Sequence, residues 1–312
     1  TVNDDFKRFN QKLDMFCRTQ WDSEVKSAKA DQFFEGYSMP HARARSSDGF
    51  DQRDYALRNA AWHVTNVLRD LHKDDDRKEG FFDHFSTHEE GSVTRYEFEN
   101  AEQATSELKK VAEFCGADLF GVCEYDERWM YSGVYSSATQ DSKPVGIPDD
   151  LNHVIVTGES MDEGLTKTVP SALSGSATGM GYSNDSVTLL TLAQYIRNLG
   201  YEAVASMNDT GLVIPYALKA GLGEYARNQL VVTPEFGPRL RFSKIFTSLP
   251  LAIDLPKKLG VTEFCNICTA SGVSLMAGRW YLSEKSATNF LNIKWISSLR
   301  SRKGGRRIST VF

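Results

Sequence analysis

Helix-like and strand-like segments alternate between about residues 100 and 258, and this alternation limits the folds open to the chain. Helical spacing in FENAEQATSELKKVAEFCG predicts a helix that ends near Gly116, followed by a buried strand in ADLFGVCEY. Three further stretches read as β-branched strands or a short helix: NHVIVTGESM, EAVASMND and IPYALKAGLGE. Two more strands are expected around the Gly-Pro turn of QLVVTPEFGPRLRFSKIFTSLPL. Together these segments predict an α/β or α+β core.

The stretch TVPSALSGSATGMGYSND, residues 168–185, is rich in glycine and other small residues. Such a composition lets the backbone approach another group closely. The next segment predicts a helix with a polar cap around Ser183 to Asp185 and a stop at Gly200. Its apolar stripe consists of Leu189, Leu192, Ala193, Ile196 and Leu199.

A helical N-terminal part is expected before the core. The segment DQRDYALRNAAWHVTNVLRDLHK has helical spacing. Its predicted stripe consists of Tyr55, Ala60, Val64, Val67 and Leu71. We expect three parts: residues 1–100 as the helical N-terminal part, 101–258 as the core, and 259–312 as a C-terminal segment with a basic tail.

Composition excludes several classes of function. The chain has 312 residues and a net charge of −5, which argues against a general nucleic-acid binder. Its five cysteines are an odd number and are too scattered for a disulfide framework. Nucleophile-elbow, zinc-protease and phosphate-loop motifs are absent. No apolar run approaches the roughly 20 residues that a spanning helix needs.

A pair of cysteines in EFCNICTASGVSLMAG has the spacing that opens an iron–sulfur or zinc motif. The bacterial ferredoxin run is C-x2-C-x2-C-x3-C-P. On this chain Cys265 and Cys268 fill its first two positions, whereas Ser271 and Leu275 stand at the next two. Two thiolates cannot hold an ordinary four-cysteine cluster alone. The pair would therefore bind a metal poorly, share a cluster across a dimer, or have no ligand.

Four blocks of the sequence, in order, resemble the corrinoid- and iron–sulfur-dependent reductive dehalogenases of the tetrachloroethene type. They are GADLFGVCEYDERWMYS, SGSATGMGYSND, SMNDTGLVIPYALKAGLGEYARNQLVVTPEFGPRLRFSKIFTSLPL and EFCNIC. The resemblance covers roughly residues 100 to 270. The long ordered block AGLGE-x-x-RN-x-L-x-x-TPEFGPR-x-R is the most specific part of it.

This resemblance implies an α+β fold with a nitroreductase-like cobamide-binding core. The helical N-terminal part would precede the core, and an incomplete ferredoxin-like segment, truncated or degenerate, would follow it. The implied cofactor is a corrinoid of the B12 type. The family also carries [4Fe–4S] clusters, for which the ligand set here is incomplete. The implied reaction is cobalt-mediated cleavage of a carbon–halogen bond, in which a proton replaces the halide.

The resemblance also implies the site residues. Tyr182 falls on the proton-donating tyrosine, Arg241 on the arginine that supports it, and Asn208 on a polar residue of the same pocket. A phenol has a pKa of about 10, and a nearby guanidinium makes proton loss easier. The predicted cofactor contacts are Thr178, Gly179 and Gly181, and the predicted metal ligands are Cys265 and Cys268. The pocket would also draw on the N-terminal aromatic residues Trp21, Phe33, Phe34 and Trp62.

The expected partners are a small organohalide, an external electron donor and a small membrane-anchor protein, with a homodimer as a further expectation and no nucleic acid. Family members are exported by a twin-arginine signal to the outer face of the cytoplasmic membrane, and no such leader precedes Thr1. Three alternatives stay open. They are a non-catalytic corrinoid-binding homologue, an epoxyqueuosine reductase-like protein and a flavin nitroreductase-like protein.

Overall fold

A computed structural model describes residues 6–28, 31, 49–70, 91–136, 139–145, 147–169, 171–207 and 210–267. Four predicted residues, Asn208, Cys268, Phe33 and Phe34, lie outside these ranges, as does the C-terminal segment from 268 to 312. The elements before the core are η1 (Gln11–Leu13), α1 (Met15–Trp21), α3 (Gln52–Ala61) and α4 (His63–Asp70). None of the described helices is both long and apolar enough to cross a membrane.

The core mixes helices and strands, as the sequence predicts. Its helices are α5 (Ala101–Cys115), α6 (Glu163–Thr166), α7 (Ala172–Asn198), α8 (Val213–Lys219) and α9 (Val261–Ile267), with a short η2 (Glu127–Trp129). Its longer strands are β1 (Leu119–Glu124), β4 (His153–Ser160), β5 (Ala203–Ser206) and β8 (Leu240–Thr247). Two small hairpins are formed by β2 (Val134–Ser136) with β3 (Asp141–Lys143) and by β6 (Glu224–Tyr225) with β7 (Val231–Val232).

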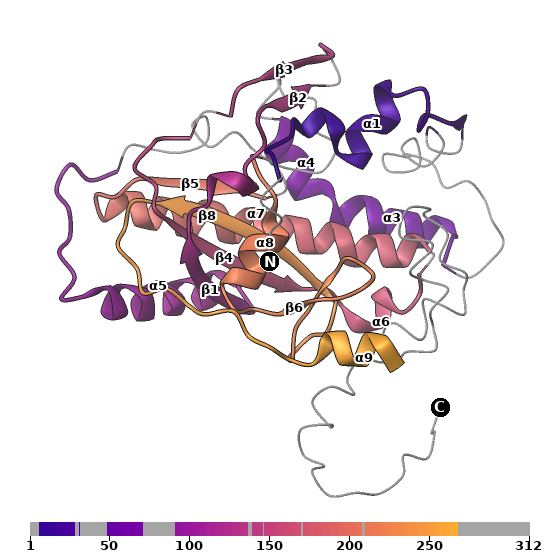
Figure 1. The fold of residues 1–312 in the computed structure, drawn as a ribbon. Coiled ribbons are helices and arrows are strands. Elements are labelled where there is room, and N and C mark those ends of the chain that lie inside the picture. Colours follow the sequence, from indigo (N-terminus) through magenta and orange to yellow (C-terminus); the bar gives the residue numbers. More distant parts are fainter. Residues whose placement is uncertain are drawn as a thin grey trace, which may run out of the picture.

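The four longer strands form one antiparallel sheet in the order β1-β4-β8-β5 (Figure 1). Alternate side chains of these strands enter two separate clusters, because neighbouring residues of a strand point to opposite faces. On one face, Ile155 and Ile245 pack with residues of α5 and α7. On the other, Val154 and Phe246 pack with residues of α8.

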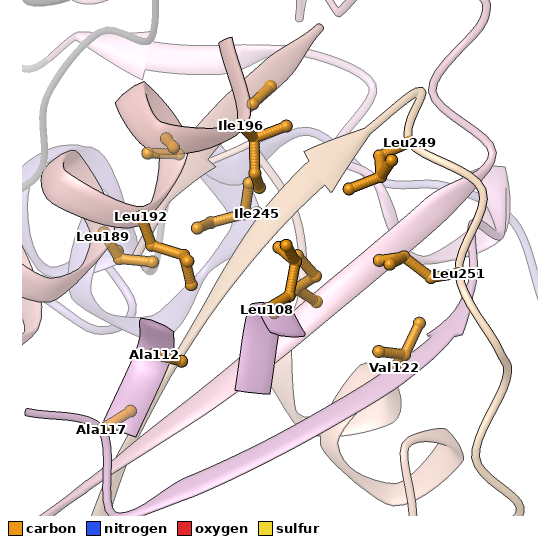
Figure 2. Close-up of a cluster of buried hydrophobic side chains, with 14 of the residues drawn as sticks. Leu108, Ala112, Ala117, Val122, Leu189, Leu192, Ile196, Ile245, Leu249 and Leu251 are labelled. Atoms are coloured by element: carbon orange, nitrogen blue, oxygen red, sulfur yellow. The ribbon is translucent and has the colours of Figure 1, made fainter. Parts of the chain in front are cut away.

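Figure 2 shows the cluster beneath α5 and α7. Leu108 of α5 and Ile196 of α7 have no exposed surface, and both lie against the sheet residue Ile245. Burying a leucine or isoleucine side chain contributes about 1.5–3 kcal/mol to stability. This cluster therefore fixes α7 on the sheet, and α7 carries the predicted site. The architecture confirms the α+β class, whereas its nitroreductase-like detail stays a prediction.

Helix α7 begins earlier than the sequence pattern predicts. Ser171 is its N-cap and forms a capping box with Ser174, so the whole glycine-rich stretch is helical. The polar residues from Ser183 to Asp185 lie inside the helix and are not its cap. Glycine weakens a helix, but it lets neighbouring elements pack directly against the backbone. Tertiary packing has outweighed local propensity here.

The predicted stripe of the N-terminal helix is wrong. The helix is interrupted at Trp62, between α3 and α4, and the buried residues are Ala61, Trp62 and Thr65. Val64 and Val67 are instead exposed. The largest aromatic side chain of the segment fixes which face lies against α7, and its burial overrides the aliphatic pattern.

The region between β1 and β4 also differs in detail from the expected loop, because it contains η2 and the hairpin of β2 and β3. The first described residues of the chain pack on this region. Gln11 donates its backbone N–H to the carbonyl oxygen of Gly133, and Phe6 lies against Trp129 with ring centroids 5.6 Å apart. The N-terminal part and the core therefore share an interface.

Candidate active site

Tyr182 and Arg241 meet in the interior, as the sequence comparison predicts. Tyr182 lies in α7 and is 3% exposed. The guanidinium carbon of Arg241, from β8, lies 3.8 Å from the centroid of the tyrosine ring. A cation over an aromatic face is attracted by the electron density of the ring. The phenol and the cation thus form one unit, in which the guanidinium stacks on the ring.

Gly181 makes this stacking sterically feasible. A Cβ atom at residue 181 would lie 2.8 Å from Cγ of Arg241, which is closer than carbon atoms pack. The arginine side chain therefore crosses α7 at the one place beside Tyr182 where the helix surface is bare backbone. Sheet register holds the other end, since Arg241 pairs with Glu159 across β4 and β8.

Trp62 covers the tyrosine from the N-terminal part. The two ring centroids are 5.0 Å apart, and the indole N–H donates to the carbonyl oxygen of Gly175, 3.0 Å away. A Cβ at residue 179 would lie 2.3 Å from Cδ1 of Trp62. Gly179 is therefore required for the indole to lie this close to α7. Trp62 was expected at the pocket, whereas its direct packing on Tyr182 was not.

The predicted cofactor contacts have intramolecular roles in this structure. The backbone at Gly179 and Gly181 is covered by Trp62 and Arg241, as just described. Thr178 is half-buried, and its hydroxyl donates to the carbonyl oxygen of Ser174 one turn earlier in α7. Contacts of these three residues with a corrinoid stay a prediction. Trp21, another expected pocket residue, donates its indole N–H to the carbonyl oxygen of Lys12.

Two buried carboxyl groups behind the stacked pair were missed by the sequence analysis. Asp185 of α7 is 1% exposed and Glu159 of β4 is 3% exposed. Ser243 donates its hydroxyl to Asp185, and the hydroxyl of Thr188 lies 2.9 Å from Oε1 of Glu159. A sequence signal existed for one of them: Asp185 follows Tyr182 by three residues, so a helix places both on one side.

Burial governs the protonation of both acids. It raises the pKa of Asp185 to about 6, although the Ser243 hydrogen bond and the cations Arg241 and Lys244 act in the opposite direction. Burial, together with the negative charge of Asp185, raises the pKa of Glu159 to about 8. A carboxyl group transferred out of water favours its neutral form. Near neutral pH the pair therefore carries about one negative charge.

The predicted metal ligands lie at the edge of the described chain. Cys265 is half-buried in α9, and Cys268 lies outside the described residues. Within the described ranges, no three histidine, cysteine, aspartate or glutamate side chains gather as a metal site. Glu224 joins this segment to the core, because its carboxylate accepts the backbone N–H groups of Leu259 and Val261. This part of the molecule does not fit a complete four-cysteine cluster.

Chemically, the stacked pair is a proton donor held beside a permanent positive charge in a dry interior. Loss of the phenolic proton makes the ring of Tyr182 more electron-rich, which strengthens its attraction to Arg241. Arginine keeps its charge throughout, so it stabilises the phenolate without losing a proton itself. Such an arrangement suits a reaction that needs a single proton delivered where water is excluded.

Comparison with known proteins assigns this arrangement to a class. Residues 136–251 match the family model described as the reductive dehalogenase subunit. This part of the chain belongs to the reductive dehalogenase family, whose members are oxidoreductases that act on carbon–halogen bonds. The matched range contains Tyr182, Arg241, Asp185 and Glu159.

Within that family, the curated relatives are tetrachloroethene reductive dehalogenases. The protein from Desulfitobacterium hafniense is 37% identical over 208 residues, which cover 56% of this chain and 38% of the relative. The protein from Sulfurospirillum multivorans is 34% identical over 191 residues, covering 53% of this chain and 38% of the relative. The chain thus spans well under half the length of the relatives it matches.

Solved structures agree on the fold. The catabolic reductive dehalogenase NpRdhA superposes with a TM-score of 0.65 at 20% sequence identity, covering 86% of this chain and 34% of that one. A second reductive dehalogenase structure, described as suggesting a mechanism for B12-dependent dehalogenation, gives a TM-score of 0.63 at 20% identity. It covers 84% of this chain and 34% of that one. At this level of identity the likeness concerns the fold alone.

Proposed function

We propose that this chain carries out corrinoid-dependent reductive dehalogenation of a small organohalide, with Tyr182 as proton donor and Arg241 as its electrostatic support. The observation that carries the proposal is the guanidinium of Arg241 stacked 3.8 Å from the centre of the Tyr182 ring, inside the range that matches the family. The relatives named for tetrachloroethene, and the relative described for B12-dependent dehalogenation, support this choice of reaction and cofactor.

The donor set fits the proton-supplying side of such a site. When bound, a cobamide would supply the low-potential metal at which a carbon–halogen bond can be broken. The chain's own residues hold the proton: the phenolic oxygen of Tyr182 carries it, and Arg241 stabilises the anion that remains. Trp62 covers the tyrosine and excludes water, which strengthens every charge interaction there. Thr178, and outside the described residues Asn208, are proposed to line the same pocket.

Electron supply is a separate part of the proposal. The described residues do not provide a complete iron–sulfur ligand set, so no electron path is derived through this chain. We propose an external electron donor. A small membrane-anchor protein, export to the outer face of the cytoplasmic membrane and a homodimer remain proposals that rest on the family resemblance alone.

Cobalt content per chain, measured after anaerobic expression with a cobamide, tests the cofactor assignment. We expect close to one cobalt per chain, with the absorbance of a corrinoid. Absence of cobalt would overturn the assignment, and flavin absorbance in the purified protein would replace it with a nitroreductase-like function.

Substitution of Tyr182 by phenylalanine tests the proton donor. With a strong chemical reductant in place of the natural electron donor, we expect halide release by the cobamide-loaded protein to fall by about 100-fold or more in Tyr182→Phe, because general acid catalysis contributes about that much. Cobalt content should stay unchanged.

Tyr195→Phe is the matched control. Tyr195 lies on the same helix, and its hydroxyl donates to Glu107 at the surface, so this variant should keep the rate of halide release. Equal rates in Tyr182→Phe and the unaltered protein would contradict the role of Tyr182. Equal loss in both variants would indicate damage to α7.

A further inference from the structure

Glu159 and Asp185 have no role in the proposed proton donation, yet both are buried beside it. Glu159 is the cross-strand partner of Arg241, and Asp185 lies one helical turn after Tyr182. Ser243, which donates to Asp185, is two residues from Arg241 on the same face of β8. Ionised carboxylates are rarely buried without a cation in direct contact. The position of these two acids therefore needs an explanation.

Hydrogen-bond accounting at Thr188 gives the state of Glu159. The Thr188 hydroxyl oxygen lies 3.1 Å from the carbonyl oxygen of Cys115 and 2.9 Å from Oε1 of Glu159. A hydroxyl group has one hydrogen to donate, and a carbonyl oxygen can only accept. Both contacts are satisfied when Thr188 donates to Cys115 and a protonated Glu159 donates to Thr188. The geometry thus favours the neutral form of Glu159.

Asp185 has the opposite environment. Its Oδ2 accepts the hydroxyl of Ser243, which favours the ionised form. Its Oδ1 is buried and has no hydrogen-bond partner in the part of the chain that the structure describes. No ion pair with a described lysine, arginine or histidine involves this carboxylate, and Arg241 and Lys244 attract it from a greater distance. One acid is thus arranged to hold a proton, and the other to carry a charge.

We propose that Glu159 and Asp185 form a buried acid pair that holds one proton between its two carboxyl groups near neutral pH and thereby sets how readily Tyr182 gives up its proton. Both are positioning residues, since they act through Arg241 and the field at the phenol. This role for the pair rests on the proposed function of Tyr182. Removal of the second proton places two negative charges behind Arg241, disfavours the phenolate and makes Tyr182 a weaker acid.

The surrounding charges are few. From β8 the pair faces Arg241 and Lys244, and the ammonium of Lys244 donates to the carbonyl oxygen of Met207, 2.8 Å away. Asp118, which precedes β1, adds a weaker negative charge near Glu159. From α3 and α4 the nearest polar groups are Trp62 and Thr65, neither of which titrates. The net charge of this interior therefore changes mainly through the pair.

Infrared spectroscopy of the protein without added cofactor tests the shared proton. We expect a carbonyl-stretch band of a protonated carboxylic acid at neutral pH that disappears in Glu159→Gln. In Asp185→Asn the band should titrate at lower pH, because the neighbouring charge that opposes ionisation of Glu159 has been removed. A band that survives in Glu159→Gln, or a midpoint unchanged in Asp185→Asn, would overturn the pair.

Absorbance titration of tyrosinate tests the effect on Tyr182. The difference between each protein and its Tyr182→Phe counterpart isolates this one phenol. At the alkaline pH where tyrosine titrates, both acids of the pair are ionised, so Glu159→Gln and Asp185→Asn should each lower the midpoint, by about one pKa unit. Glu113→Gln, at an exposed position of α5, should leave it unchanged. Equal midpoints in all variants would overturn the link to Tyr182.

A further variant covers the case in which Asp185→Asn does not fold. Ser243→Ala keeps both carboxyl groups and removes the hydrogen bond that favours ionised Asp185. We expect a second protonated-acid band in the infrared spectrum of this variant near neutral pH, and its absence would contradict the assignment of the charge to Asp185. None of these measurements requires a cobamide. A failed dehalogenase assay and a failed acid pair are therefore distinguishable.

Discussion

Glu159 shows how a single buried residue makes stability depend on pH. In the unfolded chain its carboxyl group ionises near the ordinary value of 4.5, whereas in the folded protein the proton is retained until about pH 8. Between these values the unfolded state releases a proton that the folded state keeps. The free energy of unfolding therefore decreases as pH rises through this window, by up to about 1.4 kcal/mol per pH unit.

Substitution of Glu159 by glutamine should remove this contribution. We expect Glu159→Gln to be increasingly more stable than the unaltered protein as pH rises from about 4.5 to about 8, with a constant difference above that range. Urea unfolding followed by circular dichroism at several pH values measures it. Glu113→Gln, at the surface of α5, should show no such trend. Parallel curves for Glu159→Gln and the unaltered protein would show that Glu159 ionises normally in the fold.

At the scale of elements, α7 holds the site because its small residues admit side chains from two directions. Trp62 enters from the junction of α3 and α4 over Gly179, and Arg241 enters from β8 over Gly181. Tyr182 follows directly and receives both. A helix with larger residues at these two positions would keep its contact with the sheet but would exclude the groups that surround the tyrosine.

Gly179→Ala tests this packing. The added methyl group would lie 2.3 Å from Trp62, so the indole has to move away from α7. We expect a loss of about 1–3 kcal/mol in the free energy of unfolding, as is typical of overpacking, in spite of the better helix propensity of alanine. Urea unfolding measures the change.

Gly164→Ala in α6 is the matched control, because the nearest atom to its new methyl group is a carboxylate oxygen of Asp162 at 3.3 Å. This variant should be neutral or slightly more stable than the unaltered protein. Equal stabilities of the Gly179 and Gly164 variants would show that Trp62 is not held against α7.

At the scale of the whole molecule, one side chain joins the core to the segment that carries Cys265. Glu224 accepts two backbone N–H groups before and at the start of α9, and Thr262 donates its hydroxyl to the other carboxylate oxygen. Arg227 adds a hydrogen bond to Asn266. The position of α9 therefore depends on polar contacts with the loop after α8.

Glu224→Ala should release this segment with little effect on the main sheet. We expect faster alkylation of Cys265, measured by mass spectrometry of the peptide, and faster amide hydrogen exchange over residues 259–267. Exchange in β4 and β8 should remain slow. Glu263→Ala, at an exposed position of α9, serves as control. Unchanged labelling of Cys265 in Glu224→Ala would show that apolar packing alone holds α9.

Local patterns predicted most of the core elements. Helix α5 ends at Gly116, and β4 and α8 lie where apolar alternation and Pro215 indicate them. These signals depend on neighbours in sequence, so they can be read from one chain. The start of α7 could not, because a run of glycine and serine looks like a loop until the side chains that pack against it are known.

The candidate site was predicted only in part, for a related reason. Tyr182 and Arg241 came from the resemblance, and the structure brings them together. Glu159 occupies a strand that otherwise reads as apolar, and its partner Asp185 was interpreted as part of a helix cap. Their proximity depends on how α7 lies across β4 and β8. No spacing within one segment encodes that crossing.

The hydrogen bond between Trp62 and Gly175 has a consequence for how the molecule is assembled. It joins residues 113 positions apart. Contacts between distant parts of a chain form late, because closing a long loop costs entropy before any contact repays it. During synthesis the indole must wait until α7 has emerged from the ribosome. Tyr182 therefore acquires its cover only after the N-terminal helices and the later core have met.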